Sequence, residues 1–210
     1  LFERAKELGQ TAVAITDHGV MYGAVDFYKA SKKHGIKAII GCEMYLAPRG
    51  MGDKIHSLDR HYSHIVLLAK NDEGYRNLIK LNSLSFTEGF YTKPRIDMKA
   101  LREHSAGLIA LSGCVAGKIP QYILDDDYES AKKAALEMKE IFGEDFYLEV
   151  QDHGIPEEKK VFMGLCRLSH DTGIELAATN DVHYLNKSDS YTQAILMCIQ
   201  TGNTIADGKP

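Results

Sequence analysis

The sequence lacks three features that would each point to a particular class of protein. Its longest purely apolar run, residues 194–199, is far below the roughly 20 residues that span a bilayer, so we expect a soluble protein with no membrane partner. Its 25 Lys and Arg against 29 Asp and Glu give a net charge of -4, which argues against a large basic nucleic-acid footprint. Its four cysteines are scattered without a C-x-x-C pair, which favours free thiols in a reducing cytoplasm.

Motifs of several large enzyme classes are absent as well. Residues 113–118 (GCVAGK) have neither the spacing nor the Ser or Thr of a phosphate-binding P-loop. The sequence also contains no G-x-S-x-G and no G-x-G-x-x-G. Any catalytic chemistry therefore has to come from another arrangement of residues.

The sequence does contain a regular alternation of short apolar segments and amphipathic segments. With 210 residues and 44% hydrophobic side chains, it suits one domain with a substantial core. The spacing of Tyr22, Val25 and Tyr28 predicts a helix that turns these side chains inward and ends at Gly35. The alternation as a whole predicts an α/β fold with a mostly parallel sheet or a barrel.

Two predicted strands run out into Asp and His at their carboxyl ends. The first, AVAI, is followed by Asp17 and His18, and residues 174–184 (IELAATNDVHY) carry Asp181 and His183. In parallel α/β sheets, ligands gather at this edge. In an extended chain, the spacing of two points Asp181 and His183 to the same side. We therefore expect them to share a metal ion, with His18 as a further ligand that Asp17 orients.

Glu43, His64 and Cys114 lie at or near other predicted strands and could face the same cavity. Imidazole, carboxylate and thiolate together suit zinc, manganese or iron better than magnesium alone. Such a site polarises a phosphate ester and activates water, so it predicts phosphoester hydrolysis. Taken singly, each residue has a plainer interpretation: a hydrogen-bonded structural histidine, a salt-bridged or solvated carboxylate, and an inert core thiol.

Two further groups have competing interpretations. Lys93 and Arg95, beside two aromatic residues, could hold phosphate or single-stranded DNA, or could form an ordinary charged loop face. His153 follows a predicted strand, and we interpret it as part of a turn with Gly154 rather than as a residue of the cavity.

Several motifs occur together in a fixed order: ITDHG, IIGCEMY, a strand-borne His64, SGC, GFYTKPRID and ATNDVHY. In this combination the chain resembles the PHP (polymerase and histidinol phosphatase) domain of the bacterial replicative DNA polymerase III alpha subunit. The resemblance covers essentially the whole chain. YTKPRID and ATNDVHY are more specific to the polymerase branch than to the free-standing phosphatases.

The resemblance implies a distorted (β/α)7 PHP barrel with a cluster of divalent metal ions at the carboxyl ends of its strands. The family's first strand carries an H-x-H that is absent here, so we expect a barrel lacking its first strand. We expect the PHP domain over residues 1–203 and the start of a linker toward the polymerase palm over residues 204–210. The matching metal ligands are His18, Glu43, His64, Cys114, Asp181 and His183, of which His18, Glu43 and His183 are the expected catalytic residues.

The implied function is metal-dependent phosphoester hydrolysis, as a 3′-5′ exonuclease that proofreads a DNA primer end. The parent would be a cytoplasmic DNA-directed DNA polymerase, a nucleotidyltransferase of DNA replication. The other domains of the alpha subunit and a proofreading exonuclease subunit would be its partners. Two alternatives stay open. One is a catalytically inactive structural module that braces the polymerase or docks that exonuclease, and the other is a free-standing PHP phosphatase acting on a small phosphate ester.

Overall fold

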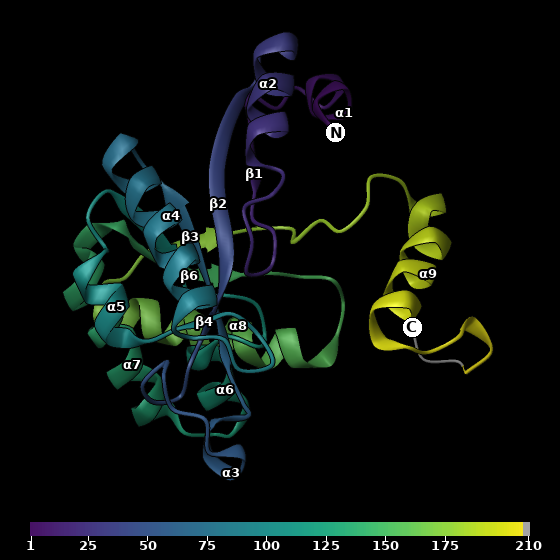
Figure 1. The fold of residues 1–210 in the computed structure, drawn as a ribbon. Coiled ribbons are helices and arrows are strands. Elements are labelled where there is room, and N and C mark those ends of the chain that lie inside the picture. The colour runs from purple at the N-terminus through teal and green to yellow at the C-terminus, as the bar shows by residue number, and fades with distance from the viewer. Residues whose placement is uncertain (208–210) are drawn as a thin grey trace.

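Strands and helices alternate along the chain in the computed structural model, which describes residues 1–207 (Figure 1). The strands are β1 (Ala12–Ile15), β2 (Lys37–Leu46), β3 (Ser63–Ala69), β4 (Arg95–Ile96), β5 (Leu108–Leu111), β6 (Phe146–Val150) and β7 (Leu176–Ala178). The helices are α1 (Phe2–Glu7), α2 (Ala24–His34), α3 (His56–Asp59), α4 (Asp72–Thr87), α5 (Met98–Glu103), α6 (Lys118–Leu124), α7 (Tyr128–Phe142), α8 (Pro156–Thr172) and α9 (Ser190–Thr201), with short 3-10 turns at Gly143–Asp145, Lys187–Asp189 and Ile205–Asp207.

The strands form one sheet in the order β1-β2-β3-β5-β6-β7, with β4 paired to β2. The long strand β2 changes partner along its length, because its first half pairs with β1 and its second half with β3. Gly41 stands at this change, where a side chain would collide with Leu68 of β3. Within the described residues the path ends at β1 and β7. The expected α/β class is confirmed, as a curled sheet of the distorted PHP-barrel type.

One strand departs from the parallel arrangement that the alternation predicts. β3 runs antiparallel to both β2 and β5, whereas the other pairs are parallel. A parallel connection needs a crossover that carries the chain back over the sheet, usually as a helix. Between β2 and β3 the chain offers only the four-residue helix α3 within a Gly- and Pro-containing loop, so the strand returns antiparallel.

The reversal of β3 decides which side chains can meet. The carboxyl ends of the parallel strands lie at one edge of the sheet, and the amino end of β3 lies at the same edge. His64 near the start of β3 is therefore level with Tyr45 near the end of β2. A histidine at the beginning of a strand thus reaches the edge where the other strands end.

The core has two parts. The larger cluster fills the space between the sheet and helices α4 to α8, and Leu67, Leu78 and Leu148 in it are fully buried. The smaller cluster joins α1 and α2 to β1 through Phe2 and Phe27, whose ring centroids are 4.7 Å apart. In Figure 1 these elements stand above the rest of the fold, and α9 lies to one side of it.

The inward side of α2 is not the predicted one. Tyr22, just before the helix, is 83% exposed, and Val25 and Tyr28 are also exposed, whereas Phe27 is buried. The helix is rotated because Phe27 packs against Phe2 of α1. The predicted glycine stop is confirmed, since Gly35 ends α2 in the left-handed conformation.

The end of the predicted domain lies close to the end of the described chain. Residues 205–207 form a 3-10 turn, and residues 208–210 of the predicted linker lie outside the described residues. The domain limit at residue 203 stays a prediction. None of the helices in residues 1–207 combines the length and the apolar character that crossing a membrane requires.

Candidate metal centre

Three side chains from neighbouring elements meet at the edge where the parallel strands end. His18 follows β1, Glu43 lies in the second half of β2, and His64 is near the start of β3. Nδ1 of His64 is 2.7 Å from Oε1 of Glu43, and Nε2 of His18 is 3.5 Å from Oε2. One possible ligand atom from each residue lies within 4.8 Å of the other two. The three are thus close enough to reach a single divalent ion.

Backbone hydrogen bonds hold the loop after β1 against β2. The Glu43 amide donates to the Asp17 carbonyl at 3.1 Å, and the Gly19 amide donates to the Glu43 carbonyl at 2.8 Å. The Asp17 carboxylate lies beside Gly23, at the start of α2, where a negative charge is favoured by the helix dipole. Asp17 thus fixes Glu43 through its backbone, while its role in orienting His18 stays a prediction.

Glu43 is the buried charge of this cluster, with 3% of its surface exposed. Burial alone would raise the pKa of its carboxyl group. The hydrogen bond from His64 and the nearby charges of His18 and His64 outweigh burial and hold the pKa of Glu43 below its usual range. The group is therefore ionised at neutral pH, as a metal ligand has to be.

Cys114 joins the cluster from the loop after β5. Its Sγ is 3.8 Å from Oε1 of Glu43 and 3.6 Å from Nδ1 of His64. Burial raises the pKa of the Cys114 thiol to about 12, and the charge of Glu43 acts in the same direction. Without a cation the sulfur stays protonated, and a bound divalent ion would favour the thiolate.

Asp181 and His183 lie near the cluster, but in a loop rather than on a strand face. β7 ends at Ala178, and Asp181 has a φ of 43° in the left-handed region. Nδ1 of His183 is 2.8 Å from the Asp181 carbonyl oxygen, and the His183 ring centroid is 5.9 Å from that of His18. The expectation of an extended chain here is wrong, because the turn at Asp181 ends the period of two.

Lys93 lies beside the cluster. Its Nζ is 5.6 Å from the centroid of the Tyr45 ring, and that ring lies 5.3 Å from the His64 ring. A cation over an aromatic face is stabilised by the ring quadrupole. Lys93 therefore brings a positive charge to the rim of the site, and its contact with phosphate or DNA stays a prediction.

Arg95 has a different position from the one expected for a DNA contact. It is fully buried, and its guanidinium donates to the carbonyls of Gly89, Asp59, Met51 and Asp53 at distances of 2.8 to 3.2 Å. A guanidinium enclosed by carbonyl groups is not available to an external phosphate. The expected DNA contact by Arg95 is wrong for this structure, and its role is to hold the loop between β2 and β3 against β4.

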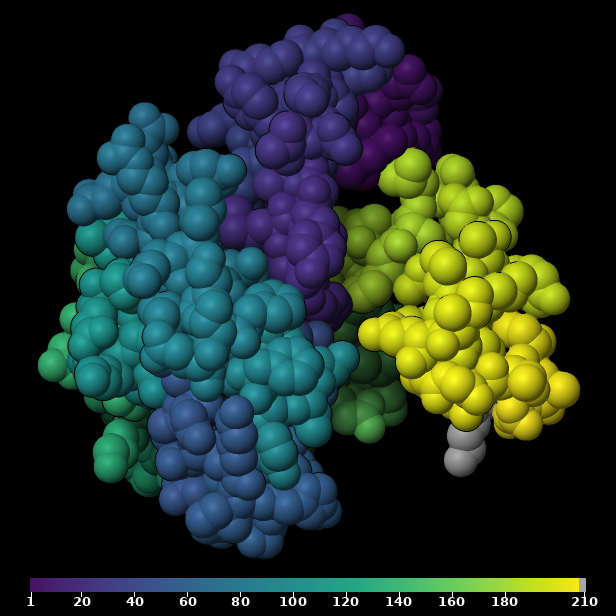
Figure 2. Space-filling model, in the orientation of Figure 1, coloured from purple at the N-terminus to yellow at the C-terminus, as the bar shows by residue number. Residues whose placement is uncertain are grey.

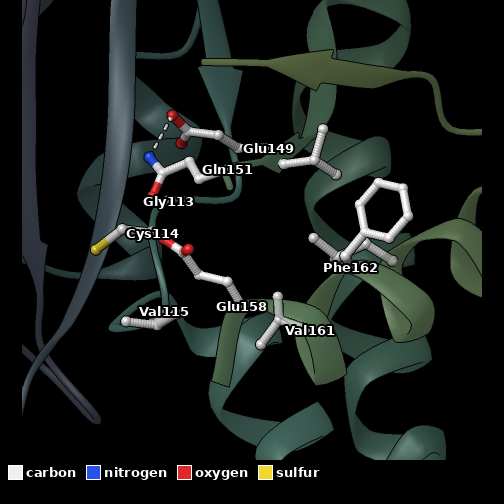
Figure 3. A pocket seen from close by; sticks show the side chains of 10 residues that line it. Gly113, Cys114, Val115, Glu149, Gln151, Glu158, Val161 and Phe162 are labelled. Atoms are coloured by element: carbon white, nitrogen blue, oxygen red, sulfur yellow. Dashed lines mark hydrogen bonds between the residues drawn. The ribbon is translucent and has the colours of Figure 1, made fainter. Parts of the chain in front are cut away.

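Glu149 of β6 is a buried acid that the sequence reasoning missed. It is 5% exposed, and its Oε2 has no hydrogen-bond partner among the described residues. Burial raises the pKa of Glu149, and the charges of Glu43 and Asp181 raise it further. Figure 3 shows it in a small pocket with Cys114. A single charge within the apolar strand sequence FYLEV was the signal that could have found it.

His153, which the sequence led us to interpret as part of a turn with Gly154, also makes contacts across the edge of the site. Its ring contacts the buried Glu158 at the start of α8 and the carbonyl of Asn180 in the loop after β7. A histidine that ties two elements together at the edge of the site has a larger role than a turn.

The sheet and the cluster at its edge define the class of protein. The chain belongs to the PHP domain family, which residues 1–153 match.

The chain is also similar over nearly its whole length to part of a larger protein. The chain is 48% identical over 209 residues to DNA polymerase III subunit alpha of Treponema pallidum (strain Nichols) and 46% identical over 198 residues to that of Thermus aquaticus. These alignments cover 99% and 93% of this chain but 18% and 16% of the relatives, so the chain spans less than a fifth of their length. Among solved structures, a candidate metal-dependent phosphoesterase from Bifidobacterium adolescentis is similar with a TM-score of 0.47 and 14% identity, over 93% of this chain and 88% of that one.

Proposed function

We propose that this chain is the PHP domain of a bacterial replicative DNA polymerase and that the domain itself is a metal-dependent phosphoesterase. The observation that carries the proposal is the convergence of His18, Glu43, His64 and Cys114 from separate elements on one small volume. Clustered, buried ligand-type groups are costly unless paired or bound to a metal. Similarity to polymerase alpha subunits supports the polymerase context.

The donor set fits a divalent cation. Imidazole nitrogen, carboxylate oxygen and a thiol that becomes a thiolate suit zinc, manganese or iron, whereas magnesium alone prefers oxygen ligands. Beside the site, Oε2 of Glu149 has no hydrogen-bond partner among residues 1–207, and a nearby cation would favour the charged form of this carboxyl group. His18, Glu43, His64 and Cys114 would hold an ion, and Asp181 and His183 would add ligands from the loop after β7.

A divalent ion bound there supplies Lewis-acid polarisation of a phosphate oxygen and activation of water. The residues of the chain set the surroundings of that chemistry. Glu43 stays ionised because His18 and His64 face its two oxygens. The side chains of His18 and His183 are 43% and 45% exposed, so substrate approaches on their side. Lys93 provides a positive charge at the rim that can hold the phosphate diester.

The proposed substrate is the 3′ end of a DNA primer, which the domain would trim as a 3′-5′ exonuclease. In this account the catalytic residues are His18, Glu43 and His183. The remaining domains of the alpha subunit are the proposed partners, and a separate proofreading exonuclease subunit is a further proposed partner. The proposed location is the cytoplasm, where the four cysteines remain free thiols as they are in this structure.

The test is manganese-dependent trimming of a primer labelled at its 5′ end. We expect the wild-type chain to shorten the primer and His183→Ala to reduce the rate by at least about a hundredfold, since it removes a group from the site itself. His170→Ala is the matched control, because this histidine is 89% exposed on α8, outside the site.

Each other outcome contradicts the proposal in a defined way. Equal trimming by wild type and His183→Ala would place the activity elsewhere. Stabilisation by metal without any trimming would favour a metal-bound structural module that braces the polymerase or docks an exonuclease. Hydrolysis of a small phosphate ester such as histidinol phosphate, without action on DNA, would favour the free-standing phosphatase.

A further inference from the structure

His153 connects the start of helix α8 to the loop that follows β7. Its Nδ1 is 2.6 Å from Oε1 of Glu158, and its Nε2 is 2.8 Å from the carbonyl oxygen of Asn180. Its backbone amide also donates to Oε2 of Glu158 at 2.6 Å. Both oxygens of one buried carboxylate thus hold this histidine, and the far side of its ring reaches across to the backbone beside Asp181.

The hydrogen-bond partners of His153 define the protonation state of its ring. A carboxylate and a carbonyl are both acceptors, so both ring nitrogens have to donate, and only the imidazolium form does so. Glu158 is 5% exposed and supplies the opposing charge. The pair is therefore a charge-assisted link, which is stronger than a bond between neutral groups.

The loop that His153 contacts contains a residue with a strained backbone conformation. It leaves β7 at Ala178 and passes through Asp181 in the left-handed region, at a φ of 43°. A non-glycine residue in that region is strained and persists where the surroundings fix it. The bond from His153 is made to Asn180, immediately before this residue.

A second set of bonds fixes the same loop from β6. The Thr179 hydroxyl donates to Oε1 of Glu149 at 2.6 Å, and the Gln151 side-chain amide donates to both Glu149 and Thr179. The Thr179 amide donates to the Val150 carbonyl at 3.0 Å. Figure 3 shows Glu149, Gln151 and Glu158 around one small pocket. Thr179 and Asn180 are thus held by successive groups of β6 and of the turn that follows it.

We propose that His153, clamped by Glu158, is a positioning residue that fixes the loop carrying Asp181 and His183 against the His18–Glu43–His64 cluster. The inference rests on the proposed function, in which Asp181 and His183 belong to the metal centre. It adds that His153, whose hydrogen bonds go to Glu158 and to the Asn180 carbonyl rather than to a proposed ligand side chain, determines whether the two parts of the site meet.

The first test measures the loop itself and needs no metal. Hydrogen exchange of the amides of residues 179–184 is compared in the metal-free wild type, in His153→Ala and in His170→Ala, the exposed histidine of α8. We expect exchange to rise by at least about tenfold in His153→Ala only, since the loop loses its link to α8. Exchange unchanged from the wild type would overturn the proposal.

The second test measures the metal. Manganese binding is titrated into the same proteins and into Glu158→Gln, which keeps the shape of the side chain but removes its charge. Partners that orient metal ligands affect affinity by about 10- to 100-fold, and we expect a loss of that size in His153→Ala and a smaller loss in Glu158→Gln. Far-UV circular dichroism verifies that the variants are folded, and if His153→Ala fails to fold, Glu158→Gln decides alone in both tests.

The two proposals fail in different ways. If the wild type binds no metal, the proposed function fails, while hydrogen exchange still tests the loop. If the wild type binds metal and His153→Ala binds it equally well, the positioning role fails and the metal centre stands.

Discussion

At the scale of single residues, Glu43 organises the candidate site. It is the buried carboxylate that both His18 and His64 face, and the Cys114 thiol lies beside it. Its low pKa comes from these neighbours acting against burial. The ionised form of this acid is stabilised by its pairing with the two histidines, which are themselves proposed metal ligands. The site is thus compact before any ion arrives.

Replacement of Arg95 tests whether this residue stabilises the fold rather than contacting DNA. Removal of the buried guanidinium in Arg95→Ala leaves four carbonyl groups without their donors. We expect the free energy of unfolding to fall by about 3 kcal/mol or more, since bonds to charged donors are each worth about 1.5–3 kcal/mol. Urea denaturation measures this. Arg102→Ala, which removes two surface ion pairs, to Glu137 and Glu140, is the control and should change stability little. A stable Arg95→Ala that binds DNA more weakly would restore the DNA-contact interpretation.

The His153–Glu158 pair predicts a pH dependence with a defined sign. The bond to Glu158 raises the pKa of His153 above its ordinary value of 6.5. The stability that the charged His153 adds to the fold is therefore complete below pH 6.5 and is lost as pH rises through the raised pKa. Burial acts to raise the pKa of Glu158, but the hydrogen bonds from the ring and the amide of His153 outweigh it and hold this pKa below 4.5. The stability that the ionised Glu158 adds to the fold is therefore lost as pH falls through the lowered pKa. Asp181, the other charge near the ring, also favours the imidazolium.

The measurement is the difference in stability between wild type and His153→Ala, followed by thermal unfolding over a series of pH values. We expect the difference to be largest between about pH 4.5 and about pH 6.5 and to shrink on both sides. A difference that grows as the solution becomes alkaline would contradict the assigned charge states.

The sequence predicts single residues well where a motif carries them. His18, Glu43, His64 and Cys114 each stand beside a strand in a recognisable motif, and the structure brings these four together. Arg95, Glu149 and His153 were misjudged because their roles depend on contacts with residues far along the chain, such as Thr179 and Asn180. No local pattern encodes those contacts.

At the scale of elements, the end of helix α4 shows how tightly the loop under the site is packed. A side chain at Gly89 would overlap the carbonyl oxygen of Arg95 and crowd that of Ser85. We expect Gly89→Ala to lower the free energy of unfolding by about 2 kcal/mol or more, because backbone rather than a flexible side chain has to move. Gly52→Ala is the matched control, since nothing lies within 4 Å of its added carbon, and it should be nearly neutral. Equal stability of the two variants in urea would contradict this packing.

Elements were predictable from periodicity, while their directions were not. The apolar run AVAI locates β1, and Gly35 ends α2 as its sequence position indicates. The antiparallel course of β3 depends on a connection that does not cross over the sheet, which composition alone does not reveal. The loop at Asp181 was misread because an apolar strand pattern does not indicate where pairing stops.

At the scale of the whole molecule, the fold brings ends of distant strands to one edge of a curled sheet. His18 and His183 are separated by most of the chain, yet their rings lie 5.9 Å apart. Figure 2 shows that the C-terminal segment, in yellow, lies beside the body of the molecule rather than within it. The fold class and the edge that carries the site followed from the strand–helix alternation, whereas the closeness of β1 and the loop after β7 follows from the curl of the sheet.

The central claim is that this edge is a metal centre, and calorimetric titration of the 210-residue chain with manganese or zinc tests it most directly. Glu43→Gln serves as the comparison, because it keeps the size of the side chain and removes the charge that the cluster shares. We expect saturable, near-stoichiometric binding by the wild type and binding weaker by more than about tenfold in the variant. Absence of binding by the wild type, or equal binding by both proteins, would contradict the account.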